Sequence, residues 1–190
     1  MAHFSEESKF VMKNYDTIEE IIAARAALDQ ELTEALNSLE GDLQRSDWWE
    51  SGWEFRSGPG EAWVSRQQWR IPNDHAVAIG IEGFTANGLF GRGEAAQLYV
   101  WVPKALPKLN ERLLAALAVN EEELPGDLAR KINGYVLTAT IAKCPPGAPD
   151  PEDYLEEVRE QTLEFIECCA ERMMKFDMTI RNSAQECSTV

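Results

Sequence analysis

The spacing of the hydrophobic residues changes twice along the chain, and these changes constrain the fold more than any other feature. From Ile18 to Leu43 they recur every three or four residues, as on one face of a helix. From Trp53 to Pro103 they alternate with small or polar residues, as in strands that bury one side. Helical spacing returns from Pro151 to Phe176. The expected order is therefore helix, sheet, helix.

Short connections join the strand-like segments of the middle region. The turn at 57–61 and the glycine-rich stretch at 85–94 leave no room for the crossover that parallel strands require. A last strand is predicted at 134–142, and a helix at about 108–118. We therefore predict an α+β fold, in which an antiparallel meander sheet of about five strands carries the N-terminal and C-terminal helices on one face.

A chain of 190 residues is most simply one domain. Thr17 and Glu20 fit a capping box, so the domain is expected to span residues 16–177. Residues 1–15 are expected to be a flexible N-terminus and 178–190 a flexible C-terminal tail. Nothing resembles a signal peptide or a membrane span, and the four cysteines form no C-x-x-C pair. These features favour a cytoplasmic protein that does not interact with membranes.

Five of the six tryptophans lie between residues 48 and 69. Strand alternation places Trp63 and Trp69 on the same side of one strand, so we expect both in the core. Trp48 and Trp49 are adjacent and cannot both point inward from one element. They are expected at a corner between the first helix and the sheet, where at least one is partly exposed and available to anchor a partner.

The charge of −15 is distributed unevenly. Residues 1–50 carry 12 acids and 4 bases, residues 51–149 carry 10 of each, and residues 150–177 carry 10 acids and 3 bases. The excess therefore lies on the two terminal helical segments. A surface of this sign repels nucleic acid and anionic membranes and attracts basic partners. We expect no direct binding of nucleic acid.

The last long helix has two distinct faces. At 100° per residue, Val158, Phe165 and Cys169 share an apolar face. The opposite face is acidic over about 27 Å. Its members are Asp153, Glu156, Glu157, Glu160, Glu164, Glu167 and Glu171. A charged outer face that only maintains solubility is one interpretation. The other is a binding surface for a cationic partner.

The main functional hypothesis is a non-catalytic binding protein that inhibits or neutralises a basic partner. A nucleic-acid-processing enzyme or a toxin fits this description, so the chain would act as a nucleic-acid mimic or an immunity protein. Phe90 and Arg92, at the tip of a glycine-rich loop, and the Trp48–Trp49 corner are the expected anchors. We expect no catalytic residues, no cofactor and no metal site.

A second hypothesis is an enzyme with carboxylates around the sheet, namely Asp74, Glu82 and Glu94. A pocket lined by Trp63, Trp69 and either Arg66 or Arg70 would support this enzyme hypothesis.

A weak likeness to PD-(D/E)XK nucleases belongs with this second hypothesis. Asp47 followed by Glu54-Phe55-Arg56 is similar to their acid, acid-x-lysine pattern. Arg56 stands where the lysine is needed and cannot deprotonate to act as a base.

A third hypothesis is a homo-oligomeric scaffold. The first helix carries an apolar stripe nearly sufficient to pair with a second copy, which would form a homodimer.

Overall fold

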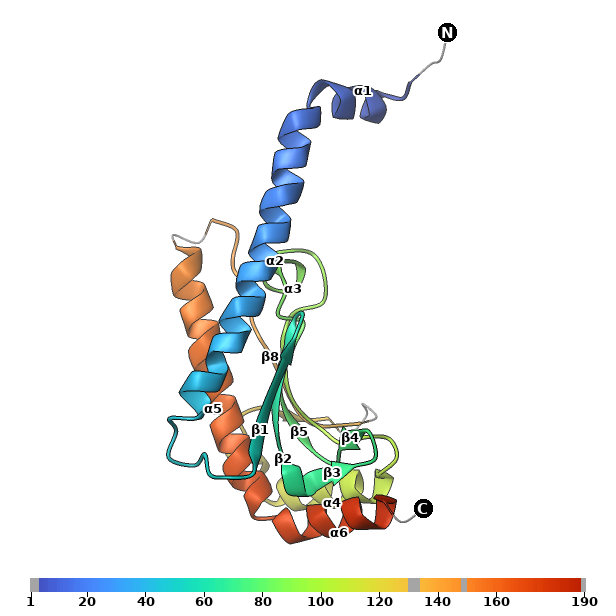
Figure 1. The fold of residues 1–190 in the computed structure, drawn as a ribbon, viewed down its shortest axis with the longest axis vertical. Coiled ribbons are helices and arrows are strands. Elements are labelled where there is room, and N and C mark those ends of the chain that lie inside the picture. Colours follow the sequence, from blue (N-terminus) through green and yellow to red (C-terminus); the bar gives the residue numbers. More distant parts are fainter. Residues whose placement is uncertain (1–3, 130–133, 148–149, 189–190) are drawn as a thin grey trace.

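A computed structural model describes residues 4–129, 134–147 and 150–188, and it confirms the predicted α+β fold. The helices are α1 (Glu6–Lys13), α2 (Tyr15–Leu43), α3 (Ala86–Leu89), α4 (Pro107–Leu117), α5 (Pro151–Met174) and α6 (Asp177–Ser188). The main sheet contains β1 (Trp53–Gly58), β2 (Glu61–Arg66), β5 (Ala78–Glu82), β6 (Gln97–Trp101), β8 (Tyr135–Thr140) and β7 (Asp127–Leu128), in that order. All of its pairings are antiparallel. Helices α2 and α5 lie side by side on one face of the sheet (Figure 1).

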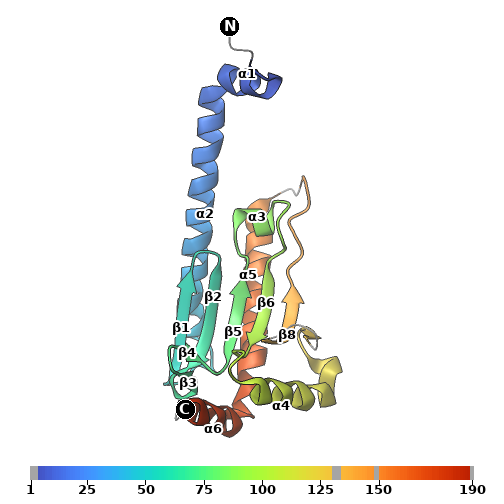
Figure 2. The same cartoon turned by 90° about the vertical axis from the view of Figure 1, so that its right-hand side faces the viewer.

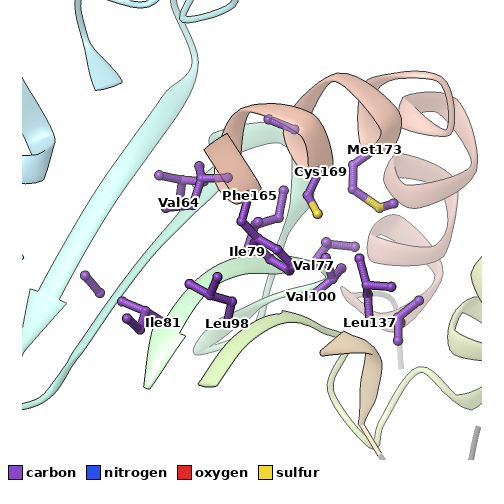
Figure 3. Packing of buried hydrophobic residues seen from close by; sticks show 14 of the residues in the cluster. Val64, Val77, Ile79, Ile81, Leu98, Val100, Leu137, Phe165, Cys169 and Met173 are labelled. Carbon is purple, nitrogen blue, oxygen red and sulfur yellow. The ribbon is translucent and has the colours of Figure 1, made fainter. Parts of the chain in front are cut away.

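Strand alternation assigns the two faces of the sheet. Val64 pairs with Ile79, Ile79 with Val100, and Val100 with Leu137, so one apolar row crosses four strands. All four side chains are buried. Phe165, Cys169 and Met173 of α5 lie over this face (Figure 3). The sheet is therefore covered by helices on the side where its β-branched and leucine residues point.

The prediction that Trp63 and Trp69 share the core is correct for Trp69 and wrong for Trp63. Strand β2 ends at Arg66, and a 3-10 turn at Gln67–Trp69 interrupts the alternation. This turn rotates Trp69 into the helix-covered core, where it is fully buried. Trp63 stays on the opposite face and is only half-buried. The chain then forms the small hairpin β3 (Arg70–Ile71) and β4 (Asp74–His75).

The N-terminal region differs from the expected flexible segment. Residues Glu6–Lys13 form α1, and α2 begins at Tyr15 rather than at the expected Thr17 capping box. Asn14 is the joint between them, because both its backbone N–H and its side-chain amide donate to the carbonyl of Phe10. Residues 6–27, which we call the arm, project beyond the rest of the molecule in both views (Figures 1 and 2). Residues 1–3 lie outside the described residues.

The expected C-terminal tail contains helix α6 instead. Its Ile180 and Ala184 are buried. The Trp69 indole Nε1 donates a hydrogen bond of 2.8 Å to Asp177 at the start of this helix. Trp69 and α6 therefore support each other, and the domain extends beyond residue 177. The rest of the expected tail, 189–190, is outside the part of the chain that the structure describes.

This docking of α6 predicts a measurable contrast between two neighbouring residues. Ile180→Ala should lower the free energy of unfolding by about 2–4 kcal/mol, because it leaves a cavity under α6. Met178→Ala, on the exposed side of the same helix, should change it by less than about 0.5 kcal/mol. Urea unfolding followed by circular dichroism measures both values. Equal effects would show that α6 does not dock.

Candidate functional site

The acidic face of α5 is fully on the molecular surface. Asp150 caps the helix by accepting from the backbone N–H of Glu152, and Pro151 occupies the first turn. On the inner side Val158, Phe165 and Cys169 are buried. Seven predicted site residues of the outer side are all exposed, namely Asp153, Glu156, Glu157, Glu160, Glu164, Glu167 and Glu171. We call these seven the α5 acidic face.

Few cations neutralise the α5 acidic face from within the molecule. Arg159 pairs with Glu156 at 2.5 Å, and its other terminal nitrogen reaches Asp42 of α2, also at 2.5 Å. The hydrogen bond that Arg159 donates to Asp42 is the main reason that the pKa of Arg159 is raised. Among the described residues, the other six members of the face form no ion pair, and Glu157 accepts only from Gln161. Their charges remain available to an external cation.

The expected anchors are less exposed than the carboxylates. Phe90 is half-buried and packs edge-on against Tyr154 of α5, with ring centroids 5.7 Å apart. Arg92 is exposed at the tip of the same loop. Lys143 holds that loop by donating to the carbonyls of Gly91 and Gly93. The loop tip therefore lies beside the first turns of α5, and Arg92 is its available side chain.

Trp48 and Trp49 form a half-buried corner. Trp48 packs on Trp53 with centroids 5.2 Å apart, and Trp53 packs on Trp69 at 5.4 Å. The buried guanidinium of Arg66 lies 5.6 Å from the centre of the Trp53 ring and pairs with Glu50 at 2.8 Å. The tryptophan-rich stretch is thus mainly a packed plug between α2 and the sheet, and only parts of Trp48 and Trp49 reach the surface.

The uncovered face of the sheet contains a hollow of about 220 Å³. Its lining includes Trp63, Asp74 and Glu82, which the second hypothesis placed together. The other expected members are elsewhere: Trp69 and Arg66 are buried. Arg70 pairs with Glu54 at 2.6 Å. Glu94 lines a separate depression, which Glu82 also lines.

Sequence reasoning missed six residues of this hollow, namely Glu61, His75, Ala78, Tyr99, Trp101 and Tyr135. A signal for two of them was present in the sequence. Tyr99 and Trp101 alternate with Leu98 and Val100, so both must leave the core face.

The hollow holds an ordered polar contact. The Tyr135 hydroxyl donates to Glu82 Oε1 at 2.8 Å. Burial, this hydrogen bond and the charge of Glu82 together raise the pKa of Tyr135 to about 12. Burial lowers the pKa of His75, and its Nε2 atom is buried with no hydrogen-bond partner among the described residues. Trp63 packs edge-on against the same imidazole at 5.0 Å.

Several chemical arrangements are not assembled in the part of the chain described. No group of three or more His, Cys, Asp or Glu residues there is placed to hold a metal ion. The nuclease-like pattern is separated, because Glu54 pairs with Arg70 while Asp47 is exposed in the corner after α2. None of the helices within these residues has both the length and the apolar character needed to cross a bilayer.

Comparison with known proteins finds no match to this chain among family models, curated proteins or solved structures.

The contact between Tyr135 and Glu82 predicts an alkaline titration. In Glu82→Gln the pKa of Tyr135 should fall from about 12 toward 10, because the charge that opposes tyrosinate is gone. It should stay above 10, since burial remains. The near-ultraviolet absorbance of tyrosinate reports the change, with Glu94→Gln as a charge-matched control. Identical titrations of the two variants would contradict the contact.

Proposed function

We propose that this chain is a non-catalytic binding protein that inhibits or neutralises a basic partner through the α5 acidic face. The observation that carries the proposal is the exposure of seven carboxylates on one helix, of which only Glu156 has an internal ion pair in the described residues. Solubility alone does not require an all-acidic helix face, because a mixture of acidic and basic side chains keeps a protein soluble as well.

Repulsion within the face favours a cationic partner. Carboxylates three or four residues apart on a helix lie about 5–6 Å from each other and destabilise it by roughly 0.2–0.5 kcal/mol per pair. Glu160 with Glu164, and Glu164 with Glu167, are such pairs. A cation placed between them removes this repulsion in addition to forming its own ion pairs. The same field accelerates association, because opposite charges steer the encounter.

The charge spacing suggests the kind of partner. Seven carboxylates over about 27 Å of helix give one charge per roughly 4 Å. A single DNA strand presents one per about 3.4 Å. A protein with a cationic cleft for nucleic acid is therefore matched in charge density, and a nucleic-acid-processing enzyme or a basic toxin is the proposed partner class. Arg92 beside the first turns of α5 offers a contact for an acid at the rim of that cleft.

Charge reversal tests this proposal. Glu160→Lys, Glu164→Lys and Glu167→Lys combined should weaken binding to a basic probe, poly-lysine, by at least about tenfold at low salt. The loss should shrink as salt is added. Fluorescence anisotropy of the labelled probe measures both effects.

The matched control reverses three exposed acids elsewhere, Glu94→Lys, Glu111→Lys and Glu122→Lys, which gives the same net charge. If this control loses as much affinity as the α5 variant, binding follows net charge and the proposed face is wrong. Proteins cross-linked to the wild type and to the control, but not to the α5 variant, are expected to be basic.

We also propose that two copies associate through the arm. Nine large hydrophobic side chains are exposed in the described residues, and seven of them lie between residues 4 and 22. They are Phe4, Phe10, Val11, Met12, Tyr15, Ile21 and Ile22. Aromatic side chains alone carry roughly 150–250 Å² each. Two copies together therefore offer on the order of the 1,000 Å² that a specific interface needs.

The spacing of the arm continues the packing stripe of α2, which supports a helix as its partner. The α2 residues buried against the body are Leu32, Leu36, Leu39 and Leu43. The same three-four alternation runs back through Arg25, Ile22 and Ile18 into the arm. In an antiparallel pair of arms centred on residue 20, Ile18 of one copy packs against Ile22 of the other. Tyr15 then lies beside Arg25 of the other copy and forms a cation–π contact with it. Arg25 has no ion pair among the described residues.

Light scattering at two protein concentrations tests the association. The wild type should show the mass of a dimer, and Ile22→Asp should show the mass of a monomer, because a charge at the centre of the pair cannot be buried unpaired. Val119→Asp is the control, since Val119 is an exposed valine far from the arm in sequence. A monomeric wild type at both concentrations would exclude the homodimer.

A further inference from the structure

The hollow on the uncovered sheet face follows from the small residues of β5. On this face β5 presents Ala78 and Gly80. Gly80 pairs with Trp63 on one side and with Tyr99 on the other, so two rings flank a position without a side chain. The two rings belong to β2 and β6, which lie on either side of β5, so their backbones are roughly 9–10 Å apart. Both rings line the hollow, together with Ala78 of β5.

Close backbone packing requires a glycine at position 80. A Cβ atom at position 80 would lie 2.1 Å from the carbonyl oxygen of Ala62 and 2.6 Å from Cβ of Trp63. No side chain fits there without moving the backbone of β2. One end of the hollow is lined by Asp74 and His75 of the β3–β4 hairpin.

The charge of the hollow is negative. Three carboxylates line it, from Glu61, Asp74 and Glu82, and its lining contains no lysine or arginine. Burial first, and then the charges of Glu61 and Glu82, raise the pKa of Tyr99 above its usual range. The phenol of Tyr99 is therefore neutral at physiological pH, and its ring is an uncharged surface of the hollow.

We propose that this hollow binds an alkylammonium group between the aromatic rings of Trp63 and Tyr99, with Glu61 and Glu82 as its counter-charges. Ring faces attract cations through their quadrupole, and carboxylates at the edge add a Coulomb attraction. Trp101 and Tyr135 line the same space and supply two further ring surfaces. A neutral or anionic ligand would gain nothing from the three carboxylates.

His75 lines one end of the hollow. The residue is 9% exposed, and its Nε2 atom has no hydrogen-bond partner among the described residues. The closest carboxylate oxygen, Oε2 of Glu54, is 3.9 Å away. Unpaired buried polar atoms are uncommon in proteins. The Nε2 atom is enclosed by the protein and lies toward Glu54.

The site is separate from the proposed function. Helix α5 covers one face of the sheet (Figure 2). The hollow lies on the other face, to which Trp63 and Tyr99 point. The cation could belong to a free small amine or to a methylated lysine side chain of a protein. Both present the same chemical group to the rings.

Titration of the full chain with choline tests the proposal, with tryptophan fluorescence and calorimetry as readouts. Choline should bind at least about tenfold more tightly than 3,3-dimethylbutan-1-ol, its neutral isostere. Sodium chloride at equal concentration controls for ionic strength. Glu82→Gln and Trp63→Leu should each weaken choline binding by about three- to tenfold. Circular dichroism confirms that each variant is folded.

Glu160→Gln is the matched control, because it removes the same charge from the opposite side and should leave choline binding unchanged. A peptide with one trimethyllysine distinguishes the two sources of the cation. If the peptide binds more tightly than choline, the ligand is a methylated lysine of a protein; if it binds more weakly, the ligand is a free amine. Equal binding of choline and its isostere, or no choline binding up to about 10 mM, would overturn the proposal. Neither result would affect the α5 acidic face, whose test uses different residues.

Discussion

The packing of α5 against the central strands is the contact on which the rest of the structure depends. Phe165 and Cys169 lie over the row that Ile79 and Val100 form, and no described residue of this row is exposed. One helix layer is enough to bury one face of the sheet. The outer side of α5 and the far side of the sheet are therefore both left to solvent. The α5 acidic face and the hollow lie on the two outer surfaces of this single layered core.

The helices and strands were predictable where the hydrophobic period is long and regular. The two faces of α5 follow from its spacing, and Glu160 and Phe165 lie where that spacing places them. Trp63 was misplaced because a three-residue 3-10 turn separates it from Trp69, and so short a turn leaves no periodic signal. Alternation shows which residues share a face, but the face that helices cover is decided by tertiary packing.

The hollow and α6 were missed for different physical reasons. The hollow depends on a neighbour relation between strands distant in sequence, such as Gly80 with Tyr99, which no local pattern contains. Helix α6 has few apolar residues, and its position depends on one buried isoleucine and on the indole of Trp69. Its signal was therefore weaker than that of α5. The arm was predicted as a helix only in part, because Asn14 breaks the helical run.

Gly80 limits the substitutions that this fold tolerates during evolution. A substitution there collides with the main chain of the next strand, so the cost falls on folding before it falls on any ligand. Selection for a stable fold alone is then sufficient to preserve glycine between Trp63 and Tyr99. The side chains that line the hollow, such as Glu61 and Trp63, are not fixed by this constraint and can change independently of position 80.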